Sequence, residues 1–206
     1  MASRLSREHL ARAARALNAA TQAQRLPPLI LMTDETRLAD PIVAARALPK
    51  GSAVILRHTD AKARHRLAGA LKEIARSRGL WLLIANDAAL AIRIGADGLH
   101  LSETRMREAA HFKALRPSWL ITAAAHSARA LVLAANARAD AALLAPIFET
   151  RSHEARRPLG VARARLMGAR AGLPVYALGG IDAANVGRLY GAQLAGIAAI
   201  GGLIPE

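Results

Sequence analysis

The sequence predicts an α/β protein: a single-domain (β/α)8 TIM barrel with an extra N-terminal helix and a missing or truncated eighth helix. Short apolar runs alternate with stretches of helical period, and eight such units fit compactly within 206 residues. The alternation implies parallel strands, because each crossover returns the chain to the same edge of the sheet. An open dinucleotide-binding sheet loses its main support, since "LMTDETRLAD" stands where G-x-G-x-x-G would follow the first strand. We therefore expect one closed barrel over residues 1–206.

Eight apolar runs are predicted to form buried strands. They occupy residues 28–33, 53–57, 81–85, 97–101, 119–125, 141–148, 174–179 and 196–201. Helical periodicity is found over residues 6–20, 41–48, 62–78, 88–94, 105–115, 127–137, 161–171 and 183–191. The helix 6–20 precedes the first strand, and too few residues follow the last strand to form an eighth helix.

The missing helix has a consequence for the eighth strand. Its outer face, including Ala195, Ile197 and Ala199, would be left without a helix to cover it. Either the helix 6–20 or a second subunit could cover this face. Because the extra helix more naturally closes the bottom of the barrel, we expect a second subunit to cover the strand, in a homodimer.

The composition bounds the class of protein. Hydrophobic residues make up 53% of the chain and aromatic residues only 3%, so the core must be mainly aliphatic. Cysteine is absent, which excludes disulfides, thiolate metal sites and cysteine nucleophiles and fits a cytoplasmic protein. The arginine-rich N-terminus lacks the apolar core of a secretion signal, and no run approaches the length of a membrane span. We expect no membrane association.

The chain is strongly basic, with 29 Lys and Arg residues against 15 Asp and Glu and a net charge of +14. Such a balance invites a nucleic-acid interpretation. The arginines are scattered over predicted helices, however, without a lysine-rich tail or an aromatic stacking platform. We therefore expect small anionic ligands and no nucleic-acid partner.

The active site of a barrel lies at the carboxyl ends of its strands. The chain carries polar or glycine residues there at every strand: Thr33-Asp34, Arg57-His58, Asn86-Asp87, His100 with Ser102 and Glu103, His126-Ser127, Thr150 with Ser152 and His153, Gly179-Gly180, and Gly201-Gly202. The glycine pairs after strands 7 and 8 are typical of a barrel phosphate site. Arg57 ends a buried strand and needs a partner, which an anionic substrate would supply.

Two of these residues have simpler interpretations. Asp87 could merely cap the helix 88–94, because Asp is favoured at that position. His100 follows an alternating strand and is better explained as a core histidine than as a ligand.

The stretch "APIFETRSH" (145–153) opens from an apolar run into polar residues, and we expect a lid over 151–158.

Four motifs in order carry a resemblance to a known family. They are "NDAALAIRIGADGLHL" (86–101), "AAHS" (124–127), "APIFET" (145–150) and "YALGGI" (176–181). Together they resemble thiamine phosphate synthase and its sister, thiazole tautomerase, over nearly the whole chain.

The resemblance implies an enzyme that couples hydroxymethylpyrimidine diphosphate to thiazole phosphate. Pyrophosphate would leave with the help of Mg²⁺, with Asp87 as a metal ligand. The residues implied as catalytic are Arg57, Asn86, Asp87, His126 and His153. The residues implied in substrate binding are Thr150, Ser152, Gly179, Gly180, Ile200 and Gly201.

The chain departs from the family pattern at several charged positions. The pattern Gln-x-Arg-x-Lys of strand 2 stands here as residues 55–59, "ILRHT", and the second metal-binding aspartate aligns with Arg105. The lysine that closes the strand-6 loop is His153. We therefore expect weak or lost Mg²⁺ binding, unless Glu103 contributes or Arg105 replaces the ion. A tautomerase-like isomerase and a non-catalytic phosphate-binding barrel remain as alternatives to the synthase.

Overall fold

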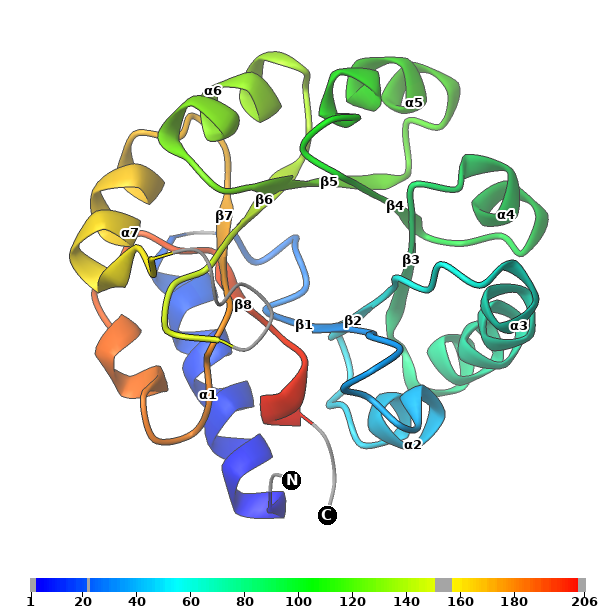
Figure 1. The fold of residues 1–206 in the computed structure, drawn as a ribbon, viewed down its shortest axis with the longest axis horizontal. Helices are drawn as coiled ribbons and strands as arrows, with labels where there is room; N and C mark the ends of the chain where they lie inside the picture. Colours follow the sequence, from blue (N-terminus) through cyan, green and yellow to red (C-terminus); the bar gives the residue numbers. More distant parts are fainter. Residues whose placement is uncertain (1–2, 22, 151–156, 204–206) are drawn as a thin grey trace.

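The chain forms a closed barrel of eight parallel strands in sequence order, as the sequence predicts (Figure 1). A computed structural model describes residues 3–21, 23–150 and 157–203. The strands are β1 (Leu29–Met32), β2 (Ala53–Leu56), β3 (Trp81–Ala85), β4 (Gly98–Leu101), β5 (Leu120–Ala125), β6 (Ala141–Leu144), β7 (Val175–Leu178) and β8 (Gly196–Ala199). The barrel closes where β1 pairs in parallel with β8, with Ile30 opposite Ala198.

Helices surround the barrel. They are α1 (Arg4–Ala20), α2 (Pro41–Arg46), α3 (Ala61–Arg78), α4 (Ala88–Arg93), α5 (Ala109–Leu115), α6 (Ala128–Asn136) and α7 (Gly160–Ala169), with the short 3-10 helices η1 (Met106–Glu108), η3 (Val186–Leu189) and η4 (Gly201–Leu203). None of the helices in the described ranges combines the length and the apolarity that crossing a membrane requires.

Two predicted elements are corrected. The helix expected over 183–191 is only the 3-10 helix η3, a stretch in which Gly187 and Gly191 lower helix propensity. The strand expected over 141–148 ends at Leu144, because Pro146 has no N–H to donate to a ladder.

Several helices begin on a side-chain cap that directly follows a strand or its loop. Asp40, Asp60, Asp87 and Ser127 each accept a hydrogen bond from a backbone N–H in the first turn of their helix. Gly79 ends α3 in the left-handed region with φ 64°, which an L side chain rarely adopts. The caps place polar groups around the mouth of the barrel.

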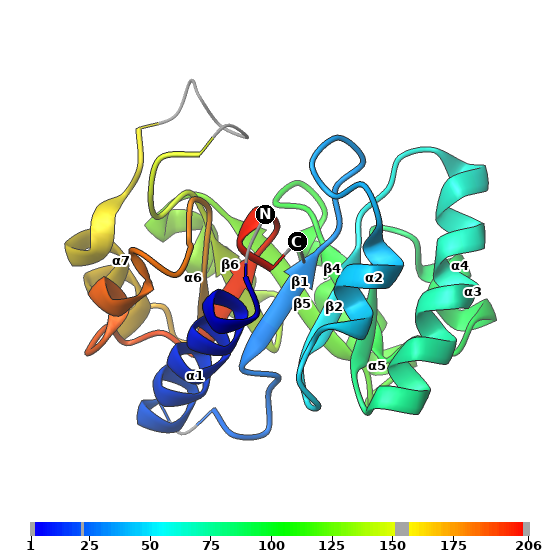
Figure 2. The same cartoon turned by 90° about the horizontal axis from the view of Figure 1, so that it is seen from below.

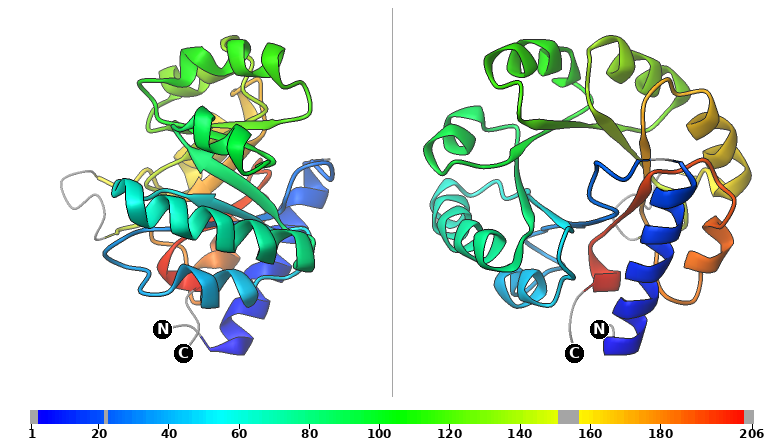
Figure 3. Two further views of the ribbon diagram at one scale, coloured as in Figure 1. Left: turned by 90° about the vertical axis from the view of Figure 1, so that its right-hand side faces the viewer. Right: turned by 180° about the vertical axis from the view of Figure 1, so that it is seen from behind.

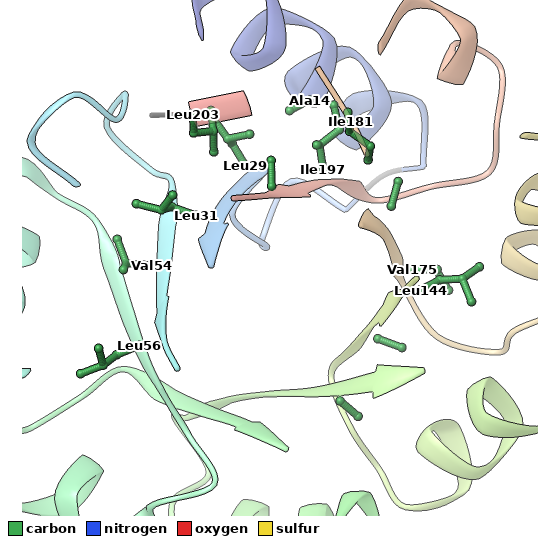
Figure 4. Packing of buried hydrophobic residues seen from close by; sticks show 14 of the residues in the cluster. Ala14, Leu29, Leu31, Val54, Leu56, Leu144, Val175, Ile181, Ile197 and Leu203 are labelled. Carbon is green, nitrogen blue, oxygen red and sulfur yellow. The ribbon is translucent and has the colours of Figure 1, made fainter. Parts of the chain in front are cut away.

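The core has two apolar layers, as strands buried on both faces require. The inner layer fills the barrel with aliphatic side chains such as Ile30, Ile55 and Leu83, together with Tyr176. The Tyr176 hydroxyl donates to the carbonyl of Pro27 at 2.7 Å, so this buried polar group is satisfied. The outer layer lies between strands and helices, and Figure 4 shows part of it.

Helix α1 lies against β8 on the outside of the barrel (Figures 1 and 3). The side chain of Asn18 in α1 donates to the carbonyl of Ala195 at 2.9 Å. Ile197 of β8 lies near Ala14 of α1 (Figure 4), and the side view in Figure 2 shows α1 running along the barrel beside β1.

This packing corrects our expectation for the eighth strand. Ala195, Ile197 and Ala199 are 1%, 0% and 3% exposed, so the outer face of β8 is covered. Helix α1 takes the place of the missing eighth helix and does not close the bottom of the barrel. The homodimer stays a prediction, without the uncovered strand as its support.

Candidate functional site

A cavity of about 590 Å³ opens at the carboxyl ends of the strands. Six residues that the sequence predicts for the site line it: Arg57, Thr150, Gly179, Gly180, Ile200 and Gly201. Two further residues, Ser6 of α1 and Arg37 of the loop after β1, also line the cavity and were missed by the sequence reasoning. The cavity thus joins the ends of β1 and β2 to those of β6, β7 and β8.

Glycine is required at the turn that follows β7. Gly179 and Gly180 have φ 97° and 67°, and a Cβ on Gly180 would lie 2.2 Å from the carbonyl oxygen of Glu149. The turn is fixed on both sides, because Phe148 N–H donates to Gly179 O at 3.0 Å and the Asn185 side chain donates to Gly180 O at 2.7 Å. Backbone rather than side chain therefore forms this wall, which suits a phosphate group.

Arg57 reaches the cavity from β2 and pairs with Asp34. Its Nη2 donates to Asp34 Oδ2 at 2.5 Å, and Arg37 Nη2 donates to the same oxygen at 2.6 Å. Hydrogen bonding from Arg37, and then from Thr36, holds the pKa of the Asp34 carboxyl well below its usual range. The partner that Arg57 needs is thus already present in the protein.

The strand register could have revealed this pair. Met32 of β1 lies opposite Ile55 of β2, and Asp34 and Arg57 each follow two residues later. Side chains two residues apart point to the same face of a sheet, here the inside of the barrel. Nothing in the strand pattern, in contrast, places Arg37.

The loop after β1 is attached to the end of β2 at further points. Glu35 accepts hydrogen bonds from the backbone N–H and the hydroxyl of Thr59 at 2.5 and 2.8 Å. Thr33 Oγ1 accepts from Arg57 N–H at 2.9 Å and lies 3.1 Å from His58 Nδ1. Thr59, which stands where the resemblance expects a lysine, is therefore used to hold the loop.

Asn86 and Asp87 lie on the other side of the mouth and are engaged by the protein itself. Asn86 has φ 56°, and its Oδ1 accepts from Ser102 N–H at 2.9 Å. Asp87 Oδ1 accepts from Leu90 N–H at 2.9 Å as the cap of α4, and its Oδ2 lies 3.0 Å from Arg64 Nη2 of α3. The capping interpretation of Asp87 accounts for one of its two oxygens and Arg64 for the other.

The neighbouring charged residues are also paired. Arg105 binds Glu108 through two hydrogen bonds of 2.7 Å and donates to the carbonyl of Asn86. The pKa of Arg105 is raised, chiefly by the hydrogen bonds that it donates to Glu108 and in part by the charge of Asp87.

His126 and Glu103 form a second pair on this side. His126 Nδ1 lies 2.7 Å from Glu103 Oε2, and the same oxygen accepts from His126 N–H at 3.0 Å. Glu103 therefore fixes the end of β5, and in the described ranges it belongs to no group of three or more His, Asp or Glu side chains that could hold a metal. Neither it nor His126 lines the cavity described above.

The arrangement does not fit the Mg²⁺ ion that the resemblance implies. Asp87 has a guanidinium at one oxygen and a helix N–H at the other, and Glu103 is bound to His126. Within the described ranges, no group of three or more His, Asp or Glu side chains could hold a metal. A hard divalent cation needs several oxygen ligands, and this side of the mouth presents cations instead.

Three other predicted residues have different outcomes. Ser152, His153 and most of the expected lid lie outside the described residues. His100 is buried, with Nδ1 3.0 Å from Thr122 Oγ1, as expected for a core histidine. Burial, and then the charge of Arg57, lowers the pKa of His100 to about 4.

Comparison with known proteins gives consistent matches. A family model described as thiamine monophosphate synthase matches residues 29–203. The thiamine-phosphate synthase of Methanoculleus marisnigri is 32% identical over 86% of this chain and 88% of that protein. That of Chlorobium luteolum is 35% identical over 84% of each. A solved structure, thiamine phosphate pyrophosphorylase from Pyrococcus furiosus, superposes with a TM-score of 0.69 at 21% identity, covers 84% of each chain and supports the fold.

Proposed function

We propose that this chain, which belongs to the thiamine monophosphate synthase family, is a transferase of thiamine biosynthesis. It couples hydroxymethylpyrimidine diphosphate to thiazole phosphate and releases pyrophosphate and thiamine phosphate. The observation that carries this proposal is the cavity, in which glycine backbone from β7 and β8 faces an arginine from β2. Residues 1–206 act as one unit in this proposal.

The chemistry explains why the cavity needs both walls. The bond between the pyrimidine methylene carbon and the diphosphate oxygen breaks, and the oxygen keeps the electron pair. The thiazole nitrogen forms the new bond to the same carbon. Negative charge therefore grows on the leaving diphosphate. Fixed positive groups near it lower the activation barrier of the reaction.

The cavity residues divide between the two substrates. Gly179, Gly180, Ile200 and Gly201 offer backbone groups to the thiazole phosphate, with the Thr150 hydroxyl beside them. Arg57 meets the diphosphate of the other substrate. Both phosphorylated molecules would then lie in one cavity, within reach of each other.

The remaining predicted residues have supporting roles in this proposal. Asn86, Asp87 and His126 hold the β3, β4 and β5 ends of the mouth in place through the contacts described above. Ser152 and His153 would act from the loop after β6. Mg²⁺, when bound in this family, helps neutralise the diphosphate, but no step here is assigned to it, because the side chains at Asp87 do not fit it.

The direct test is turnover. Purified protein is incubated with both precursors, once with Mg²⁺ and once with EDTA, and thiamine phosphate is measured by mass spectrometry. We expect product that depends on both substrates and on Arg57. Absence of product under both conditions would refute the transferase.

A second candidate is a non-catalytic phosphate-binding barrel. It is favoured because both oxygens of Asp87 contact other groups of the protein. It predicts that thiazole phosphate binds but is never converted. The isomerase alternative lacks comparable support: thiazole tautomerase, which the chain also resembles, carries a histidine on the sixth strand, and Pro146 stands at that position here. Cytoplasmic location and a homodimer remain predictions.

A further inference from the structure

We propose that Arg37 and Arg57, joined through Asp34, form a diphosphate-binding site that works without a divalent metal ion. The identity of the ligand rests on the proposed function, whereas the pair of arginines is a property of the structure. Sequence reasoning assigned no role to Arg37. The pair supplies positive charge on the side of the cavity opposite the loop that follows β6.

The geometry holds the two guanidinium groups together. Both donate to Asp34 Oδ2, at 2.6 Å from Arg37 and 2.5 Å from Arg57, so each lies beside the same oxygen atom. The Asp34 side chain is only 10% exposed, whereas those of Arg37 and Arg57 are 28% and 45% exposed and line the cavity. Two cations share one carboxylate, which leaves this cluster with one net positive charge.

The loop that carries Arg37 is held in place before any ligand arrives. Asp34 Oδ1 accepts from the backbone N–H groups of Thr36 and Arg37, at 3.2 and 3.1 Å. Glu35 ties the same loop to Thr59 and to the backbone N–H of Asp60. A guanidinium fixed in advance loses less conformational freedom on binding, and its planar N–H groups match two phosphate oxygens.

The acidic residues that line the cavity in the described part of the chain lie elsewhere. Glu149 and Asp182 line it from the loops after β6 and β7. One oxygen of Asp182 accepts from the backbone N–H groups of Ala184 and Asn185, at 2.9 and 3.0 Å. An anion therefore meets positive charge at the β1 and β2 side and the glycine backbone at the β7 turn.

The surroundings of Asp87 give an independent reason to expect diphosphate binding without a metal ion. Arg64 lies at the Asp87 carboxylate and Arg105 donates to the carbonyl of the adjacent Asn86, so a divalent cation would meet two guanidinium groups. The charge of a leaving diphosphate must then be met by the protein's own cations. Among the residues that the structure describes, Arg37 and Arg57 are the arginines that line the cavity.

The test measures pyrophosphate binding by titration calorimetry, in EDTA and again in excess Mg²⁺. We expect binding in EDTA, with a dissociation constant that Mg²⁺ changes less than about threefold. Arg37→Met should weaken binding about tenfold or more, since a charge-assisted hydrogen bond is worth about 1.5–3 kcal/mol. Arg37→Lys should keep part of the affinity, because it keeps the charge but not the planar fork.

The matched control is Arg46→Met. Arg46 is exposed at the end of α2, and this variant loses the same charge away from the cavity. Binding of thiazole phosphate to Arg37→Met checks that the turn of Gly179 and Gly180 is intact. If that variant does not fold, Arg37→Lys and Arg37→Gln are compared instead.

Two results would overturn the proposal: pyrophosphate binding that requires Mg²⁺, or equal affinities for the Arg37 and Arg46 variants. Failure of the proposed function looks different. Metal-free pyrophosphate binding that depends on Arg37, with no thiamine phosphate formed, would leave this site standing and remove the transferase. Turnover that requires Mg²⁺, with pyrophosphate binding that also requires it, would do the reverse.

Discussion

The two sides of the barrel mouth carry similar residue types but differ in what these residues contact. On the side of β6, β7 and β8, glycine turns leave a cavity, and Arg57 faces it from β2. On the side of β3, β4 and β5, every charged group discussed above is paired with another part of the protein: Asp87 with Arg64, Arg105 with Glu108, and Glu103 with His126. A polar residue at the end of a strand is therefore a candidate for the site, and its partners decide its role.

Asp34 and Asp87 make the difference concrete. Each follows a buried strand and each binds arginine, but the arginines of Asp34 line the cavity and that of Asp87 comes from α3. The first carboxylate orients cations toward a ligand. The second stabilises a helix start and its attachment to the neighbouring helix.

The largest expected effect is on Arg57. Arg57→Ala should lower turnover by about 10²–10³-fold, because a fixed donor aimed at developing charge contributes about 3–4 kcal/mol. Asp34 keeps Arg37 as a partner, so the fold should survive. Steady-state kinetics and thermal unfolding of the same preparation check both parts. Unchanged turnover would show that Arg57 does not hold the diphosphate.

Gly180→Ala comes next. The added Cβ would meet the Glu149 carbonyl at 2.2 Å in a residue with φ 67°, so we expect a cost of about 1–3 kcal/mol and weakened thiazole phosphate binding. Gly69→Ala is the control, since nothing lies within 4 Å of its position in α3 and helix propensity favours Ala. Equal affinities of the two variants for thiazole phosphate would show that the turn after β7 does not bind this ligand.

On the side of β3, β4 and β5, we expect that substituting Asp87 lowers the stability of the protein without lowering its affinity for metal. Asp87→Ala removes a helix cap and the Arg64 partner, and we expect it to cost about 2 kcal/mol. Asp40→Ala removes only the cap of α2 and should cost about 1 kcal/mol. Urea unfolding of both variants, with and without Mg²⁺, measures the difference. Stabilisation of the wild type by Mg²⁺ that disappears in Asp87→Ala would show instead that Asp87 binds the ion.

A further prediction concerns the pH dependence of stability at His100, which lies inside the barrel near Arg57. Its folded-state pKa of about 4 is below the ordinary value of 6.5, so the unfolded chain takes up this proton first as the pH falls. The free energy of unfolding should therefore fall by about 1 kcal/mol per pH unit between those two values and level off below the lower one.

His100→Gln should remove this part of the pH dependence of the free energy of unfolding, because the amide does not titrate. Urea unfolding of both proteins across that range measures the difference in slope. Parallel pH profiles would mean that His100 does not stay neutral in the folded barrel.

The sequence is sufficient for the barrel but not for the pairing of its charges. Apolar runs locate the strands because each is buried on both faces, and chain order then places Arg57, Gly179 and Gly201 at one mouth. The partners of those residues depend on contacts between separate elements. Arg64 comes from the long helix α3, and no pattern marks it among the other arginines there. The position of α1 likewise depends on Asn18, whose acceptor lies 177 residues away.

Helix α1 also sets the order in which the protein can fold. Along residues 1–206 it precedes every strand, whereas β8, the strand it covers, is the last strand. The buried face of α1, including Leu10 and Leu17, has no β8 to pack on until synthesis reaches that strand. Closing a loop that spans almost the whole chain is costly in entropy and slow. A circular permutant that carries α1 after η4 would turn this contact into a local one, so it should close its barrel faster than the natural order of elements allows.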